Sequence, residues 1–314
     1  MAMDFWEAQR KARWRTMVYL CIFVVLTLVV AVVAEYSLRA VAEDSYNPPL
    51  PILGMAFLAI TFIVALYNYM MYRHYGGGYV AESLGGYLVN PNSKNPQERQ
   101  LYNIVKEISL ATALPMPAVY ILPAEEINAF AAGLTRDNAA MAITEGALRK
   151  LNREEIQGVI AHEFGHISNA DMVLSLRLAA MVMGFFFVLY LGLKLLQGSS
   201  FRSRRENGKV GNAIMLAALI LMIAGALTWL MGTLMKAMVS RQREYLADAC
   251  SVQFTRNPQG IINALKKIEK DNIHDMPKTG SAYSHMYLED HDSWLATHPP
   301  IRKRIAAIEG RDIS

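Results

Sequence analysis

The chain has 314 residues, of which 53% are hydrophobic and 18% charged, and its formal net charge is +4. The charged share lies below the roughly 25% usual for soluble domains, and the mean hydropathy is positive at +0.19, so part of the apolar surface should face lipid. Basic residues without interleaved aromatics argue against a nucleic-acid surface, and two isolated cysteines argue against a disulfide-stapled secreted protein.

The first two predicted elements are membrane-spanning helices. Residues 16–34 carry no charge and follow a basic segment, and residues 50–72 form a second apolar run. The second run is followed by Arg73, His74 and three glycines at 76–78, which are expected to make a flexible exit. Residues 35–49, between the two runs, carry three acids against one arginine. This charge pattern predicts that the N-terminus and the chain after residue 73 are cytoplasmic.

A mixed polar and apolar segment follows. Its helical periodicity predicts a helix over residues 96–113, and short apolar runs predict strands at 118–122 and 139–144. Asn152 and Glu155 have the spacing of a capping box, so a helix should begin at Arg153.

The chemistry-bearing motif lies on that helix, where residues 162–166 read His-Glu-Phe-Gly-His. His162 and His166 are one turn apart and can bind one metal ion, and Glu163 can act as the general base that deprotonates a water. The two histidines could instead only pack on an amphipathic helix, but the predicted cap places the motif well inside a helix. Without a Pro or Gly between Ile167 and Gly184, this helix is expected to continue into the third apolar segment.

The third and fourth apolar segments are residues 172–196 and 213–235, each long enough to cross a bilayer. The loop between them, 197–212, carries four basic residues against one glutamate. Two full crossings would put this basic loop outside, contrary to the positive-inside tendency. A hairpin that enters the membrane without crossing it remains an alternative.

A catalytic zinc needs a third protein ligand and an open position. A histidine six residues after His166 is excluded, because Met172 stands there. Glu244 follows the fourth apolar segment and can close the site, and Asp248, one turn later, can orient a ligand imidazole. The alternative is an exposed face on which these acids pair with neighbouring arginines. Since all ligands meet at one ion, the chain between them must cross the membrane an even number of times.

Together these motifs resemble the HtpX family of membrane metalloproteases, which is related more distantly to the CAAX prenyl proteases. The resemblance is carried by His-Glu-Phe-Gly-His at 162–166 with Asn169 and Asp171, Ser-Arg-x-x-Glu-Tyr-x-Ala-Asp at 240–248, Asn-Ala-Phe-Ala-Ala-Gly at 128–133, and Thr-His-Pro-Pro at 297–300 followed by Arg304. It implies that His298, with Arg304 behind it, stabilises the oxyanion. It also implies that Asn128 and the strand 139–144, which contains Ala142, form the edge to which a substrate peptide adds.

The sequence therefore predicts a mainly α (α+β) integral membrane protein with four apolar helices and a zincin-like catalytic domain with a small sheet. Its expected segments are 1–78, 79–171, 172–235 and 236–314. The expected function is a zinc endopeptidase with one Zn²⁺ per chain. By resemblance, it would cleave misfolded membrane proteins on the cytoplasmic side of the inner membrane, for quality control. The alternatives are a CAAX-type prenyl-protein protease and a catalytically idle zinc-containing membrane scaffold or chaperone.

Overall fold

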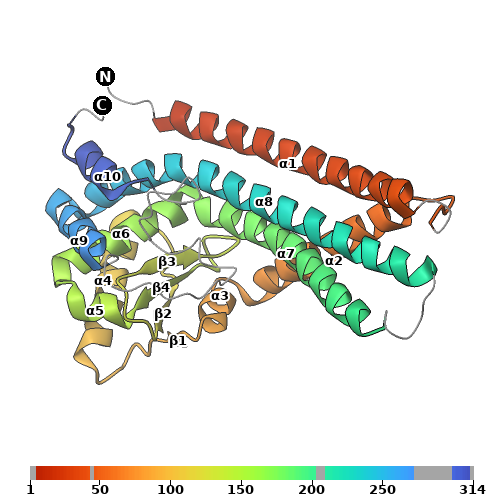
Figure 1. The fold of residues 1–314 in the computed structure, drawn as a ribbon. Coiled ribbons are helices and arrows are strands. Elements are labelled where there is room, and N and C mark those ends of the chain that lie inside the picture. The colour runs from red at the N-terminus through yellow and green to blue at the C-terminus, as the bar shows by residue number, and fades with distance from the viewer. Residues whose placement is uncertain (1–4, 43–45, 203–208, 272–298, 312–314) are drawn as a thin grey trace. The chain divides into compact units, whose positions relative to one another are not determined.

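The computed structural model describes residues 5–42, 46–202, 209–271 and 299–311 (Figure 1). Its elements in chain order are α1 (Phe5–Ala42), α2 (Ile52–Tyr75), α3 (Gly78–Ser83), β1 (Tyr87–Leu88), α4 (Pro96–Thr112), β2 (Ala118–Leu122), β3 (Ala129–Ala132), β4 (Ala140–Thr144), α5 (Glu145–Lys150), α6 (Arg153–Asn169), α7 (Asp171–Arg202), α8 (Lys209–Thr255), α9 (Pro258–Asp271) and α10 (Ile301–Ile308). The prediction of a mainly helical α+β protein with a small sheet is confirmed.

The chain folds into two compact units. The helical unit comprises Met1–Asn68 and Leu178–Met235, and the mixed unit comprises Tyr69–Arg177 and Lys236–Ser314. Among the described residues, four helical stretches are long and apolar enough to cross a membrane: Cys21–Ala42, Ile52–Tyr75, Asp171–Gln197 and Ile214–Leu234. Large apolar side chains on them stay exposed, for example Phe62 at 66%, as expected for a surface that faces lipid.

Aromatic side chains fill the core of the helical unit. The rings of Phe23 and Phe185 meet edge to face with centroids 5.1 Å apart, and Phe57 stacks on Phe185 at 6.5 Å. At Gly184 a Cβ would lie 2.6 Å from the carbonyl oxygen of Thr61. A glycine at this position therefore allows two helices of the unit to approach closely, as small residues do in membrane helix pairs.

Glu35 is a helical residue rather than part of an acidic loop, because α1 continues to Ala42. Its buried carboxylate accepts hydrogen bonds from the backbone N–H groups of Leu53 (2.8 Å) and Gly54 (3.2 Å) at the start of α2. It also accepts from Arg39 Nε at 2.8 Å and Tyr46 Oη at 3.2 Å. The carboxylate thus satisfies N–H groups that would otherwise lack a partner at a helix N-terminus.

The sheet of the mixed unit has the strand order β1-β2-β4-β3. Strands β2 and β4 are parallel, with Tyr120 opposite Ala142, whereas β1 and β3 are antiparallel to their neighbours. The predicted strands β2 and β4 and the predicted helix α4 are confirmed within one residue at each end. Strand β3 was not predicted, because Ala129–Ala132 has no polar alternation and all four residues are buried.

The glycines that follow α2 form a tight junction instead of the expected flexible exit. Gly77 donates its N–H to the carbonyl oxygen of Asn138 at 3.0 Å, and a Cβ there would lie 2.0 Å from the carbonyl oxygen of Ala132. Only glycine permits this approach. The end of α2 is consequently held against the β3–β4 hairpin.

Helix α6 occupies the centre of the mixed unit. It packs against α4, α9 and β3, and its apolar face joins one buried cluster with side chains of those elements. At Gly158 of α6 a Cβ would meet the backbone nitrogen of Ile261 at 2.6 Å, so α9 lies directly against the helix. This packing fixes the position of the helix that carries His162 and His166.

Candidate metal centre

The predicted capping box starts α6. The Asn152 side chain accepts from the N–H of Glu155 at 2.9 Å, and the Glu155 carboxylate accepts from the N–H of Asn152 at 2.8 Å. Two N–H groups at the helix terminus are thereby satisfied. His162 lies nine residues after Arg153, where the helix begins. His162 and His166 lie on one face of the helix, with ring centroids 4.9 Å apart and ring planes at 89° to each other.

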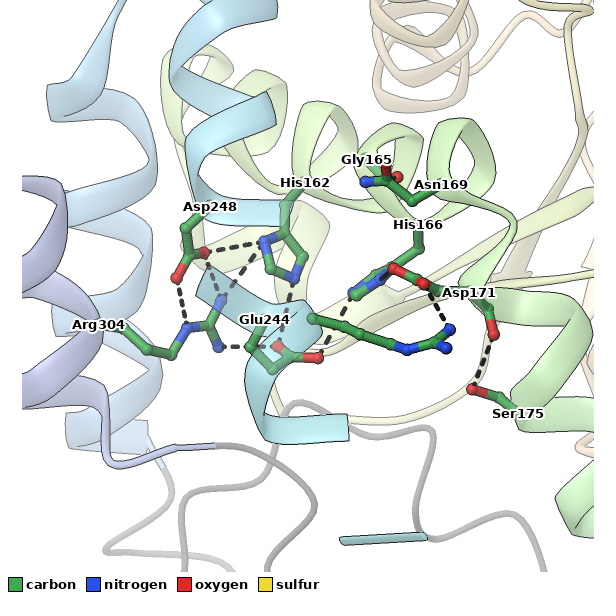
Figure 2. A network of polar contacts seen from close by, with 10 residues as sticks. His162, Gly165, His166, Asn169, Asp171, Ser175, Glu244, Asp248 and Arg304 are labelled. Carbon is green, nitrogen blue, oxygen red and sulfur yellow. Dashed lines mark hydrogen bonds and ion pairs between the residues drawn. The ribbon is translucent and has the colours of Figure 1, made fainter. Parts of the chain in front are cut away.

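Helix α8 brings Glu244 to the two imidazoles (Figure 2). Its Oε2 lies 3.5 Å from His162 Nε2, and its Oε1 lies 3.5 Å from His166 Nε2. The close approach of the helices depends on Gly165, where a Cβ would lie 3.0 Å from Ala247 Cα. The glycine between the metal-binding positions of the motif therefore has a packing role, because it lets α8 come near enough to close the site.

The three side chains fit a zinc ion. One ligand atom from each of His162, His166 and Glu244 can be chosen so that all lie within 4.8 Å of one another. His162 Nε2 and Glu244 Oε2 are buried and face each other at 3.5 Å. An imidazole lone pair and a carboxylate oxygen repel each other in a buried place unless a proton or a cation lies between them. Two imidazole nitrogens and one carboxylate oxygen form a donor set that Zn²⁺ takes in catalytic sites.

Asp248 and Arg304 support His162 from behind. Asp248 Oδ1 lies 2.9 Å from His162 Nδ1, and Arg304 donates to both Asp248 oxygens, from Nε at 2.9 Å and from Nη2 at 2.7 Å. When Nδ1–H donates to Asp248, Nε2 presents its lone pair to the metal position. The structure thus places Arg304 against Asp248, with Nη1 3.6 Å from Glu244.

The charged groups of Arg304, Asp248 and His162 change one another's pKa values. Burial alone would raise the pKa of the Asp248 carboxyl, but the Arg304 guanidinium lowers it to about 2. Burial alone would lower the pKa of the His162 imidazole, but hydrogen bonds with Asp248 and Glu244 raise it to about 9. A centre that attracts a proton this strongly without metal is electrostatically suited to a cation.

Asp171 supports His166 in a similar way; the family resemblance included this residue, but no role was predicted for it. Its Oδ2 lies 3.3 Å from His166 Nδ1, and its Oδ1 pairs with Arg243 Nη1 at 2.5 Å. Burial lowers the pKa of His166, but the hydrogen bond with Asp171 raises it above its ordinary value. The signal that could have indicated this contact is the spacing of Asp171, five residues after His166 and directly before the third apolar segment.

The expectation that α6 runs without a break into the third apolar segment is wrong. Helix α6 ends at Asn169, and Ala170 adopts the left-handed conformation with φ 57° and ψ 28°. The Asn169 side chain bonds back to the carbonyl oxygen of Gly165 at 2.9 Å, which stabilises this end of the helix. The turn at Ala170 brings Asp171 back towards His166, which a straight helix would not do.

Glu163 follows His162 on α6 and is 3% exposed. No side chain in the described part of the chain donates a hydrogen bond to its carboxylate. His298, the predicted oxyanion residue, lies outside the described residues.

The predicted substrate edge requires a correction. Strand β4 is paired on both sides, with Ala142 opposite Tyr120 of β2 and Phe130 of β3, so it offers no open edge. The edge strand next to α6 is β3. Asn128 directly precedes it, is 3% exposed, and accepts on Oδ1 from the N–H of Ala129 at 2.8 Å. A polar side chain committed to the backbone in this way orients the start of β3.

Residues 95–312 match the family model described as peptidase family M48. The chain is 40% identical over 220 residues to the protease HtpX homolog of Ligilactobacillus salivarius, covering 68% of this chain and 73% of that protein. It is 36% identical over 269 residues to the homolog of Caldanaerobacter subterraneus subsp. tengcongensis, covering 83% and 86%, and 31% identical over 305 residues to that of Streptococcus pyogenes, covering 94% and 96%. The crystal structure of S. mikatae Ste24p aligns with a TM-score of 0.48 at 16% identity, covering 95% of this chain and 67% of that one.

Proposed function

The chain belongs to peptidase family M48 and is a metallopeptidase, and from this premise we propose that it is an endopeptidase with one zinc ion held by His162, His166 and Glu244. The observation that carries the proposal is the convergence of these three side chains, with one ligand atom from each within 4.8 Å of the others and Glu244 3.5 Å from both imidazoles. A structural zinc site usually has four protein ligands, whereas three leave a position for substrate.

The chain's own residues divide the chemistry between them. Zinc, when bound, would supply a Lewis acid that polarises the scissile carbonyl and makes a water more acidic. The Glu163 carboxylate takes the proton of the attacking water and passes it to the leaving amine. Asp248 and Asp171 hold the imidazoles in the tautomer that presents Nε2 to the metal. We propose by family resemblance that His298 stabilises the oxyanion.

The test is a comparison of the unchanged chain with Glu163→Gln in cleavage of an unstructured protein such as casein. We expect Glu163→Gln to abolish cleavage and to retain close to one zinc per chain, because Glu163 takes no part in metal binding. Glu154→Gln is the matched control, since Glu154 is exposed on the same helix. Loss of zinc in Glu163→Gln would instead give Glu163 a structural role. Equal activity of the three proteins would refute the proposed chemistry.

We propose that the substrates are membrane or membrane-associated proteins, misfolded ones included, whose extended segments add to β3. Four apolar helices and the position of β3 beside α6 support this proposal. Added strands bind largely through backbone hydrogen bonds. A model peptide N-methylated on alternate residues beside the cleaved bond should therefore be cut more slowly than the unmodified peptide, and equal rates would argue against strand addition.

For topology we propose four crossings of the inner membrane with the metal centre on the cytoplasmic side. The charges around the first two apolar segments support this orientation, and burial of about 20 apolar residues outweighs a few arginines in the loop after α7. In a background without Cys21 and Cys250, a single cysteine at Ser203 should react with an impermeant thiol reagent on intact cells, and one at Ser281 should not. Both positions lie outside the described residues. Protection of position 203 would favour a hairpin that does not cross.

A further inference from the structure

A pocket of about 650 Å³ lies in the mixed unit, and none of the metal-site residues lines it. Its walls are the last residues of α2, Arg73–Tyr75, the β1–β2 pair, and the β3–β4 connection at Asp137 and Asn138. Arg73 and Tyr75 are also the last turn of the second candidate span, Ile52–Tyr75. By chain continuity alone, the pocket begins where a hydrocarbon layer around α2 would end.

Exposed apolar side chains gather at this pocket. Tyr75 is 57% exposed and Leu88 is 59% exposed, and both line it. Tyr87, the other residue of β1, is 43% exposed. In the described part of the mixed unit, the other large apolar side chains that are exposed are Met70, within the second candidate span, and Leu110 on α4. Aromatic side chains beside a span end are typical of the headgroup layer.

The pocket is also lined by two side chains of opposite charge. Arg73 lines it from α2 and Asp137 lines it from the β3–β4 connection. Neither has an ion-pair partner within the described part of the chain, although they share one pocket. A ligand with one negative and one positive group can neutralise both, whereas a purely anionic ligand meets repulsion from Asp137.

We propose that this pocket binds the headgroup of a zwitterionic phospholipid with a primary ammonium group, in the leaflet next to the mixed unit. The phosphate lies against Arg73, the ammonium lies against Asp137, and the upper part of the acyl chains covers Tyr75 and Leu88. The occupant is a lipid rather than a peptide, because the lining includes the end of a candidate span and the exposed apolar side chains of Tyr75 and Leu88. The contact would hold the catalytic unit at the bilayer surface.

The experiment measures binding of dioctanoyl phosphatidylethanolamine to the full chain in detergent, by the shift in thermal unfolding as the lipid is titrated. Dioctanoyl phosphatidylglycerol and free phosphoethanolamine are the comparison ligands. We expect the phosphatidylethanolamine to bind more tightly than either. Arg73→Gln should weaken it about fivefold, the upper range for one exposed charge contact. Asp137→Asn should remove the preference over phosphatidylglycerol.

Matched variants separate the pocket from general detergent effects. Leu88→Ser should weaken lipid binding, whereas Leu110→Ser, which exchanges another exposed leucine on α4, should not. Lys266→Gln removes an exposed cation from α9 and should also have no effect. Equal affinity for the two lipids in the unchanged chain, or equal loss in the Leu88 and Leu110 variants, would overturn the proposal. Equally tight binding of free phosphoethanolamine would show that the ligand is a soluble phosphoamine and not a lipid.

Discussion

The two histidines of the metal centre are supported by arms of the same chemistry and different depth. His162, Asp248 and Arg304 have side chains 1–3% exposed, whereas His166, Asp171 and Arg243 are 9–16% exposed. Each arm has a carboxylate that contacts Nδ1 of the imidazole and a guanidinium that pairs with the carboxylate (Figure 2). We call the buried set with His162 the deep arm and the more exposed set with His166 the outer arm. The deep arm should stabilise the fold and orient its imidazole, whereas the outer arm should mainly orient its imidazole.

The largest effect on zinc binding should come from Glu244, which contacts both imidazoles. Glu244→Ala removes one of three metal-binding groups, so we expect it to lower zinc affinity and cleavage more than any change behind the ligands. Asp248→Ala should weaken zinc binding by about 10–100-fold. Competition with a chelator, followed by measurement of zinc content, gives both values. Normal zinc binding and cleavage by Glu244→Ala would place the third ligand elsewhere.

The second prediction breaks the deep arm alone. Arg304→Met leaves the buried Asp248 carboxylate without its ion pair, which should lower the free energy of unfolding by about 3–5 kcal/mol. Arg302→Met is the control on the same helix, because the Arg302 side chain is 89% exposed and its pair with Glu269 lies at the surface. Thermal unfolding in detergent compares the two. If both variants unfold at the same temperature, the deep arm has no special role in stability.

The third prediction uses pH to separate proton binding from metal binding. Since the pKa of His162 is raised to about 9, its protonated form stabilises the metal-free protein fully below its ordinary pKa of 6.5. That stabilisation is lost as the pH rises through about 9. Zinc must displace this proton, so zinc affinity should rise by about tenfold per pH unit across the same window. Titrations at several pH values test this, and an affinity independent of pH would contradict it.

The smallest effect is expected from the outer arm. Asp171→Asn keeps an oxygen that can accept from His166 Nδ1 but loses the charge that pairs with Arg243, so zinc affinity should fall by about tenfold or less. Arg243→Ala leaves the carboxylate in place and should cost less still. The absorption spectrum of bound Co²⁺ reports ligand geometry directly. The spectrum should change in Asp171→Ala and stay the same in Arg243→Ala. Identical spectra in the two variants would mean that Asp171 only links the helices and does not orient His166.

Much of the metal centre followed from local spacing. His162, His166 and Glu163 belong to one helix, and the Asn152–Glu155 cap that starts this helix was predicted and is confirmed. Periodicity also located α4, β2 and β4, because alternation and apolar runs are properties of short stretches of chain. Glu244 was proposed from its one-turn spacing to Asp248 and from the need for a third ligand, and the structure brings it to both imidazoles.

Other features depend on contacts between distant residues, and no local pattern could indicate them. Strand β3 is at the edge of the sheet, whereas β4, which contains Ala142, lies between β2 and β3. The order of the strands therefore overturned the expectation that the strand of Ala142 is the edge. The burial of Glu35 depends on N–H groups at the start of α2, and Gly77 is needed because Ala132 lies beside it.

The sequence alone was enough to locate the apolar segments, the capped helix and the candidate metal ligands, since each depends on spacing within one element. Tertiary structure alone decided the break at Ala170, which carries no glycine or proline signal and is compensated by the contacts of Asn169 and Asp171. It also decided the position of Arg304, which lies 56 residues from Asp248 in the chain and is buried where the carboxylates of Asp248 and Glu244 neutralise it.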